Sequence, residues 1–275
     1  MPSPSFGNRR VLALESRRAR EIESLIATFG GRPIVAPAVK ELPLESDDDT
    51  LALCDGIVRH EFDAVVFLTG VGVRALVDAV DRAGRRDEFV AALKRTRVVV
   101  RGPKPSAVLR ELQVPVWANA PEPNTWRELL DAIDAKADEW TLSGARVAVQ
   151  EYGVSNPELL EALRSRGAQV TAVPTYQWAM PDDLTPLRDA ATAVAAGQVD
   201  VLVITSGIQL VHFSRVAREM GIEDAVTRAL SGMLIASIGP SASAEIRRHG
   251  LEPSFEPSHP KMGLLIREAA ERLSP

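Results

Sequence analysis

Short apolar runs alternate with amphipathic segments along most of the chain. The runs AVVFL (64–68) and VLVIT (201–205) are rich in branched residues and are bounded by turn signals, which predicts central strands buried on both faces. Apolar residues at helical spacing between Ile22 and Phe29 end at Gly30-Gly31, as expected for a helix that a left-handed glycine terminates. Because strands that alternate with helices form parallel sheets, the pattern predicts an α/β protein.

The second half of the chain repeats the first at an offset of 137 residues. The segment FDAVVFLTG (62–70) returns as VDVLVITSG (199–207). The same offset relates Gly30 to Gly167, Pro37 to Pro174, and Gly102-Pro103 to Gly239-Pro240. Since each half reads as strands and helices in the same order, we expect two similar α/β domains.

Length and composition suit two such domains. The 275 residues are enough for two domains of roughly 100–150 residues each. A hydrophobic content of 45% with 25% charged residues is typical of globular proteins. No run approaches the ~20 apolar residues of a membrane span, and the N-terminal MPSPSFGNRR does not resemble a signal peptide. We therefore expect a cytoplasmic protein with no membrane partner.

Charge and cysteine content exclude further classes. The formal net charge of −5 argues against nucleic-acid binding, which needs a basic face. An anionic small molecule could still be held by local cations and by N–H groups at helix starts. The single cysteine, Cys54, has no partner for a disulfide in this chain, and we interpret it as a structural thiol.

The common catalytic motifs are missing. The chain has no Walker A loop, no H-E-x-x-H, no G-x-S-x-G elbow and no Cys and His residues at ligand spacing, so no metal and no cofactor are predicted. The segment Gly70-Val71-Gly72-Val73-Arg74-Ala75 formally fits a dinucleotide fingerprint. It lies in mid-domain, however, and its counterpart 206–209 lacks the second glycine, so we interpret it as a coincidental match.

The candidate chemistry lies in paired turns between a strand and a helix. Ligands of doubly wound sheets bind outside the carboxyl ends of the strands, and N–H groups at helix starts bind carboxylates. The pairs are Thr69-Gly70 with Ser206-Gly207, Gly102-Pro103-Lys104 with Gly239-Pro240-Ser241, and Glu15-Ser16-Arg17 with Glu151-Tyr152-Gly153. One such turn would be ordinary helix capping, whereas six that face a common cleft indicate a polyanion site.

These turns resemble those of the uroporphyrinogen-III synthase family, and the resemblance spans nearly the whole chain. The family's halves carry a Phe-Thr-Ser turn, a later G-x-x-T-A-x-x-L turn and a central Val-Tyr. The corresponding segments here are Phe67-Leu68-Thr69 with Ile204-Thr205-Ser206, 102–109 with 239–246, and Thr175-Tyr176-Gln177. The opening LESRRAREIESLIATFGGRPIVAP is similar to the family's first strand, arginine turn and helix. The threonine of the second pattern is replaced by Pro105 and Ala242.

The resemblance implies a domain arrangement. We expect two similar doubly wound, flavodoxin-like parallel-sheet domains, joined by a two-stranded linker and with a cleft between them. Residues 1–38 and 178–275 would form a discontinuous domain, residues 40–174 would form the inserted domain, and the linkers would lie near 37–40 and 174–177. A monomer is expected for two domains joined by thin linkers.

The resemblance also implies a reaction. A lyase of this family cyclises hydroxymethylbilane with loss of water and inversion of the last pyrrole ring, without metal or cofactor. Tyr176 is the candidate acid that assists the departure of hydroxide, and the alternative is a packing residue in the linker. The expected substrate-binding residues are Ser16, Arg17, Arg18, Thr69, Gly70, Gly102, Lys104, Tyr152, Ser206, Gly207, Gly239 and Ser241.

A second hypothesis is a non-catalytic protein that binds a tetrapyrrole or another polyanion. Two α/β domains around a hinge also describe small-molecule sensors that report occupancy by closing. Such a protein would bind a tetrapyrrole but leave the isomer ratio of the products at the spontaneous value.

Overall fold

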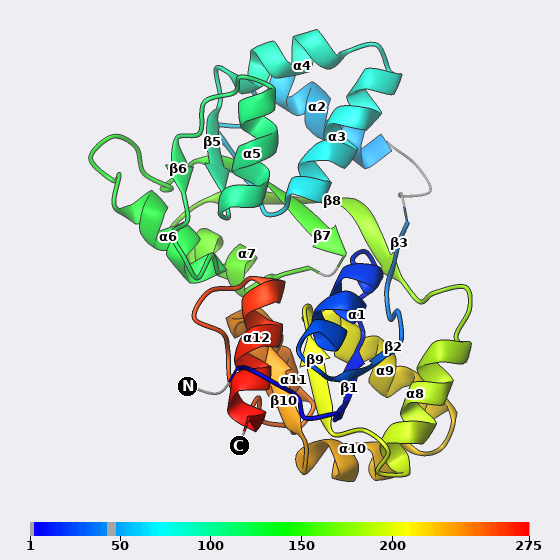
Figure 1. Cartoon of the computed structure of the whole chain (residues 1–275). Coiled ribbons are helices and arrows are strands. Elements are labelled where there is room, and N and C mark those ends of the chain that lie inside the picture. The colour runs from blue at the N-terminus through cyan, green and yellow to red at the C-terminus, as the bar shows by residue number, and fades with distance from the viewer. Residues whose placement is uncertain (1–2, 43–47, 154, 275) are drawn as a thin grey trace. The chain divides into compact units, whose positions relative to one another are not determined.

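The chain divides into two compact units. The structure, a computed structural model, describes residues 3–42, 48–153 and 155–274, except for the side chains at positions 41, 152, 153, 176 and 177. Unit 1 consists of Met1–Lys40 and Ala179–Pro275, and unit 2 of Glu41–Trp178. Each unit is an α/β fold around its own sheet, so the predicted fold class is confirmed (Figure 1). That each unit is an independently folding domain stays a prediction.

Unit 2 is built on a sheet with the strand order β3-β8-β7-β4-β5-β6 in its described residues. The pairs from β8 to β6 are parallel. The strands are β3 (Lys40–Leu42), β4 (Ala64–Phe67), β5 (Arg97–Val100), β6 (Ala118–Asn119), β7 (Arg146–Gly153) and β8 (Gln169–Ala179). The helices are α2 (Asp48–Val58), α3 (Gly70–Arg82), α4 (Arg86–Leu93), α5 (Pro103–Glu111), α6 (Trp126–Asp134) and α7 (Pro157–Ser165).

Strand β4 is buried on both faces because helices cover both sides of the sheet. Val65 and Phe67 pack into the core formed with α2 to α5. Ala64 and Val66 pack into the opposite core, formed with α6 and α7. Successive residues of a strand point to opposite faces, so a strand covered on both sides must be apolar throughout. The prediction of a buried strand over AVVFL is confirmed.

Unit 1 repeats this plan around a parallel sheet with the order β10-β9-β1-β2. The strands are β1 (Arg10–Ala13), β2 (Arg32–Val35), β9 (Val201–Ile204) and β10 (Leu234–Ser237). The helices are α1 (Ala19–Thr28), α8 (Thr185–Ala195), α9 (Gly207–Glu219), α10 (Glu223–Ser231), α11 (Pro240–Arg248) and α12 (Met262–Leu273). Helices α1 and α12, blue and red in Figure 1, cover one face together, while α8 to α11 pack against one another.

In both sheets the order of the strands reverses at equivalent places. Numbered by their place in the repeat, the strands β2-β1-β9-β10 of unit 1 and β8-β7-β4-β5 of unit 2 both have the order 2-1-3-4, as in flavodoxin-like sheets. The reversal lies between β1 and β9 in unit 1 and between β7 and β4 in unit 2. Ligands of such sheets bind at the carboxyl end of this reversal. Each unit therefore presents one edge at which a ligand is expected.

An aspartate and an arginine clamp the amino end of each reversal. Asp200 accepts hydrogen bonds from the Arg10 backbone N–H (2.8 Å) and guanidinium (3.0 and 2.8 Å), while its own N–H donates to the Arg10 carbonyl (2.9 Å). Asp63 makes the same contacts with Arg146, at 2.8 Å to the backbone N–H and 3.1 Å to the guanidinium Nη2. The repeat keeps these aspartates because each aligns two strands that are distant in sequence.

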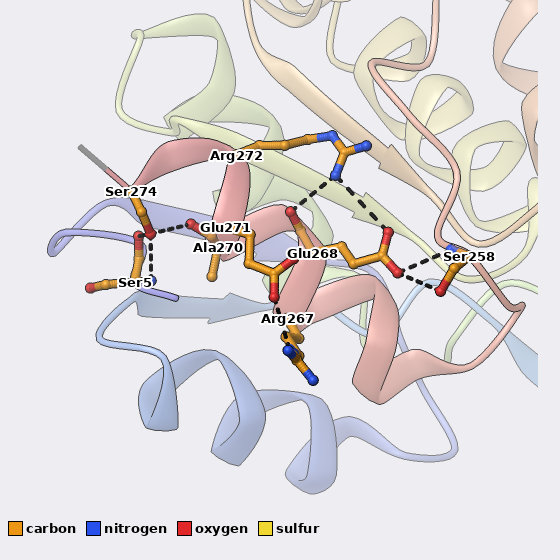
Figure 2. A network of polar contacts seen from close by, with 8 residues as sticks. All are labelled: Ser5, Ser258, Arg267, Glu268, Ala270, Glu271, Arg272 and Ser274. Carbon is orange, nitrogen blue, oxygen red and sulfur yellow. Dashed lines mark hydrogen bonds and ion pairs between the residues drawn. The ribbon is translucent and has the colours of Figure 1, made fainter. Parts of the chain in front are cut away.

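The end of the chain is fastened to unit 1 by polar contacts on α12. Figure 2 shows Glu268 accepting hydrogen bonds from the N–H (3.0 Å) and hydroxyl (2.7 Å) of Ser258. Ser274 accepts from the N–H of Ser5 at 2.9 Å. The Arg272 guanidinium lies 3.9 Å above the ring of Phe255, whose backbone bridges to β10. These contacts fix the segment that leads from the sheet edge to α12.

Cys54 lies in the core of unit 2. Its side chain is buried among the apolar residues packed under α2 and α3. Burial raises the pKa of the Cys54 thiol to about 12, so the thiol is protonated at neutral pH. This environment supports its interpretation as a structural thiol.

The described helices are short and amphipathic. Helices α3 and α9 have 13 residues each, which corresponds to a length of about 20 Å. No helix in the described ranges combines the length and apolar character needed to cross a membrane.

Removing the clamp of unit 1 is expected to lower its resistance to acid. Arg10 hydrogen bonds to Asp200 and lowers the pKa of that carboxyl from 3.8 to about 2. The stabilisation is therefore complete above pH 3.8 and is lost as the pH falls through about 2. Because about a third of the Asp200 side chain is exposed, we expect Asp200→Asn to lose only about 1 kcal/mol of unfolding free energy at pH 7.

Urea unfolding across this pH range measures the effect. The difference between wild type and Asp200→Asn should shrink as the solution is acidified. Glu219→Gln, which breaks an exposed pair within one helix, serves as the control and should change stability by less than about 0.5 kcal/mol. Equal losses in the two variants would contradict a specific role of the clamp.

Candidate substrate-binding turns

In unit 1 the candidate residues gather along one edge of the sheet. Ser16, Arg17 and Arg18 follow β1, Ser206 and Gly207 follow β9, and Gly239 and Ser241 follow β10. These strands are parallel neighbours, so their carboxyl ends lie side by side. The structure therefore brings the predicted residues of this unit together.

In unit 2 the equivalent residues also lie at the carboxyl edge. Thr69 and Gly70 follow β4, and Gly102 and Lys104 follow the neighbouring β5. Tyr152 belongs to β7 and Tyr176 to β8, but their side chains lie outside the described residues. The role of either phenol stays a prediction.

Glycines let two helix starts approach each other in each unit. A Cβ on Gly70, at the start of α3, would lie 2.9 Å from the Lys104 carbonyl oxygen in α5. A Cβ on Gly207, at the start of α9, would lie 2.7 Å from the Glu245 Cβ and 3.7 Å from the Ser241 carbonyl oxygen in α11. Two adjacent helix N-termini supply more N–H groups and a stronger local positive potential than one. Each unit thus carries a paired start, and in unit 1 the acidic side chain of Glu245 packs directly against it.

A buried glutamine organises the turn of unit 1. The Gln209 side-chain oxygen accepts hydrogen bonds from the N–H groups of Thr205 (2.9 Å) and Ser206 (3.2 Å). Its amide nitrogen donates to the Thr205 hydroxyl at 2.8 Å, and this hydroxyl donates to Glu15. Because the Ser206 N–H is engaged, the candidate backbone donors are those of Gly207 and Ile208, which have no acceptor within the helix.

Glu15 connects this turn to the arginine turn after β1. One of its carboxylate oxygens accepts from Thr205 and, at 3.4 Å, from the Gln209 amide. The other accepts from the backbone N–H of Arg18 at 3.1 Å. The two turns at the reversal point of unit 1 are therefore held together by one half-buried carboxylate.

In unit 2 a glutamine from another element organises the turn after β4. Gln150, at the end of the apolar part of β7, is fully buried, and its side-chain oxygen accepts from the Thr69 N–H at 3.4 Å. Its amide nitrogen donates to the Thr175 hydroxyl at 3.0 Å and to the Glu151 carbonyl oxygen. The Thr69 hydroxyl accepts from the Gly72 N–H at 3.0 Å and so caps α3.

The same glutamine explains the apparent dinucleotide fingerprint. A Cβ on Gly72 would overlap the side-chain amide of Gln150. The second glycine of the motif therefore makes room for a protein side chain, and its counterpart in unit 1 is Gln209 itself. The interpretation of the motif as a coincidental match is supported by this contact.

The Gly102 turn of unit 2 is rigid and supplies few donors. Gly102 has a φ of 92°, donates its N–H to the Asn119 side-chain oxygen (3.1 Å) and has no room for a Cβ beside Asn124. Pro103 and Pro105 have no N–H, so Lys104 is the only backbone donor among residues 103–105. The replacement of a threonine by Pro105 thus removes an N–H as well as a hydroxyl.

The candidate cations are exposed. Arg17, Arg18 and Lys104 are solvent-accessible, and the Arg18 Nε donates to Glu21 at 2.6 Å. The Ser16 hydroxyl accepts the Val39 N–H at 3.0 Å, so this residue holds the segment that follows β2. Arg18 pairs with Glu21 through both Nε and Nη2, and because this pair is exposed it contributes little stability, so a ligand carboxylate could replace Glu21.

Sequence reasoning missed the buried glutamines. Their signals were present: Gln150 is a polar residue at the end of the apolar run VAV, and Gln209 stands where the repeat predicts a glycine. The partners of Gln150 are far apart from it in sequence, so its signal does not identify them, whereas Ser206 and Gln209 have the spacing of a capping box, which could have revealed their contact. The role of the Gln150 amide became visible only with the fold.

Comparison with known proteins places this arrangement in a family. Residues 20–267 match the family model described as uroporphyrinogen-III synthase HemD. The chain belongs to the uroporphyrinogen-III synthase family. Both the suspected family and the fold expected from it are therefore confirmed.

Individual relatives span the whole chain at low identity. A mutant uroporphyrinogen III synthase from the extremely thermophilic bacterium Thermus thermophilus is 24% identical, with 97% of this chain and 100% of that chain covered and a TM-score of 0.74. The Helicobacter pylori uroporphyrinogen-III synthetase is 14% identical, with 97% and 100% covered and a TM-score of 0.52. The uncharacterized protein YjjA of Bacillus subtilis is 28% identical over 269 residues, which cover 96% of this chain and 95% of that protein.

The two repeat-related glycines are expected to respond differently to alanine. Gly102→Ala adds a Cβ at a left-handed φ and against Asn124, so we expect a loss of about 2 to 4 kcal/mol in unfolding free energy. Gly239→Ala is the matched control, because its φ of 163° is extended and the nearest heavy atom to a new Cβ lies 3.8 Å away. Its loss should stay below about 1 kcal/mol in chemical denaturation. Equal sensitivity would show that the strain at Gly102 is absent.

Proposed function

We propose that this protein is a uroporphyrinogen-III synthase, a lyase that cyclises hydroxymethylbilane with inversion of the last pyrrole ring. The supporting observation is that helix starts gather at the carboxyl edge of each sheet, with α3 and α9 beside the reversal points, in a chain that belongs to this family. No metal or cofactor takes part in the proposed reaction. We further propose that the protein works as a cytoplasmic monomer.

The proposed reaction depends on the conformation in which the substrate is held more than on activation of its leaving group. The terminal hydroxyl of the substrate takes up a proton and leaves as water, and the resulting cation is attacked by the substituted carbon of the last ring. The spirocyclic intermediate reopens and recloses at the other position, and one proton is lost as the pyrrole becomes aromatic again. The net change is the loss of one water. Because the substrate ionises readily, holding it in the folded conformation supplies most of the selectivity.

The proposed roles follow from the turns. Arg17, Arg18 and Lys104 neutralise substrate carboxylates, and the first N–H groups of α3 and α9 donate to them. The N–H groups of Thr69 and Ser206 instead fix these turns, because buried glutamines accept them. Ser241, exposed at the start of α11, adds a hydroxyl.

Tyr176 is the proposed acid, and Tyr176→Phe should lower turnover about tenfold without abolishing it. A partial effect is expected because the leaving group departs even without the phenol. Initial rates of porphyrinogen formation provide the measurement. Tyr152→Phe, at the other tyrosine of the chain, is the comparison and should change KM more than kcat. An unchanged rate in Tyr176→Phe would leave it as a packing residue.

The isomer ratio of the products tests the proposed function itself. Freshly generated hydroxymethylbilane is incubated with and without the folded protein, and the porphyrins are oxidised and separated by chromatography. We expect predominantly type III product with the protein and type I without it. Type I product at the uncatalysed rate in both samples would overturn the proposal.

A non-catalytic tetrapyrrole-binding protein is the second candidate. The buried Pro105 and Ala242 favour it, because they remove two threonine hydroxyls from the family's second turn pattern. A binding protein would retain a tetrapyrrole in equilibrium dialysis yet leave the isomer ratio unchanged. Type III product would exclude this candidate.

A further inference from the structure

In both units the backbone N–H at the start of a helix donates to a glutamine, but the two glutamines belong to different elements. Thr69 and Ser206 are equivalent in the repeat, and each donates its N–H to a buried glutamine oxygen. In unit 2 this glutamine is Gln150 of β7, whereas in unit 1 it is Gln209 of α9. The repeat therefore keeps the contact while the residue that provides it has changed.

The position that holds the glutamine in one unit holds a different residue in the other unit, and the reverse is also true. The counterpart of Gln209 in unit 2 is Gly72, and a side chain there would overlap Gln150. The clamp arginines Arg10 and Arg146 align β1 with β7 at an offset of 136 residues. The counterpart of Gln150 in unit 1 is therefore Leu14, which follows β1 and is fully buried. Each unit thus contains one glutamine and one residue without a side-chain amide at this pair of positions.

The second contact of each glutamine differs between the units. The Gln150 amide nitrogen donates to Thr175, the residue before Tyr176 in β8. The Gln209 amide nitrogen donates to Thr205 and, at 3.4 Å, to Glu15. Gln150 therefore connects the start of α3 to the strand that carries the proposed acid, a connection that Gln209 does not reproduce.

We propose that Gln150 is a positioning residue, which holds the α3 turn and the Thr175-Tyr176 segment in a fixed relation. The inference rests on the proposed function for its catalytic consequence. Gln150 is fully buried and Thr175 is 5% exposed, so no solvent replaces the lost hydrogen bonds when the amide is removed. Without the amide, the two segments are joined only through the backbone pairing of β7 with β4 and β8, and we expect both to loosen beyond the ends of that pairing.

The test compares three variants. Gln150→Leu removes the amide and installs the residue found in unit 1. The double variant Gln150→Leu/Gly72→Gln transfers the glutamine and leucine of unit 1 but not the Thr205 hydroxyl, whose counterpart is Leu68; it returns an acceptor to the Thr69 N–H but not the link to Thr175. Thr175→Val removes that link together with the bond from the Thr175 hydroxyl to the Glu151 carbonyl oxygen (3.3 Å), and it keeps the contact between Gln150 and Thr69.

Backbone hydrogen exchange provides a readout that does not depend on activity. Gln150→Leu is expected to speed exchange roughly tenfold in both segments, 68–73 and 174–178. The double variant should restore protection in 68–73 alone, and Thr175→Val should loosen 174–178 alone. Strand β5 is the internal control, since faster exchange there would indicate general destabilisation. Unchanged exchange in both segments of Gln150→Leu, or loosening only together with β5, would overturn the inference.

Single turnover with protein in excess tests the catalytic consequence. Because all substrate is then bound, the isomer ratio reports closure on the protein and not the amount of folded protein. Gln150→Leu and the double variant should both lower the rate by about tenfold to a hundredfold and increase the share of type I product. Wild-type rate and isomer ratio in Gln150→Leu would overturn the catalytic part.

If the wild type itself forms no type III product, the proposed function fails. The exchange measurements would still decide whether Gln150 positions the two segments.

Discussion

Pairing of two strands that are remote in sequence is the constraint on which each unit depends. Strand β1 pairs with β9 and β7 with β4, and each pairing creates the reversal point of its sheet. Closing such long connections is entropically unfavourable, so the pairing must be stabilised by specific contacts. An Asp-Arg clamp fixes the amino end, and a glutamine amide organises the carboxyl end. The site at this edge follows from the alignment of these two strands.

The fold was largely predictable from the sequence, because its information is local or periodic. The apolar runs at 64–68 and 201–205 identify strands covered on both faces, and the offset of 137 residues reveals the repeat. The predicted site residues of each unit also fall at one sheet edge, since parallel strands end together. Sequence reasoning could not assign the Thr69 N–H to Gln150, which lies 81 residues away, although the capping-box spacing of Ser206 and Gln209 indicates the equivalent contact in unit 1. Gln150 and Gln209 reach the same N–H from a strand and from a helix, and only tertiary structure distinguishes these routes.

The candidate site also shows how a protein with a net charge of −5 can present surfaces to a polyanion. Its attraction comes from a few exposed cations and from paired helix starts, which act over short distances. The carboxylate of Glu15 is engaged by hydrogen bonds from Thr205, Gln209 and the Arg18 backbone, so it serves to hold the two turns together. The units are not identical in this respect. The Gly102 turn is braced by two prolines and two asparagines, whereas the Gly239 turn has space around it.

The complementary positions of the two glutamines have an evolutionary consequence. If recombination copied the helix start of one half into the other, two glutamines would compete for one buried space, or glycine would face leucine and leave a backbone N–H without an acceptor. Either hybrid would lose a hydrogen bond or create a steric overlap that the present chain avoids. The two helix starts are therefore not interchangeable, although they occupy equivalent places in the same architecture.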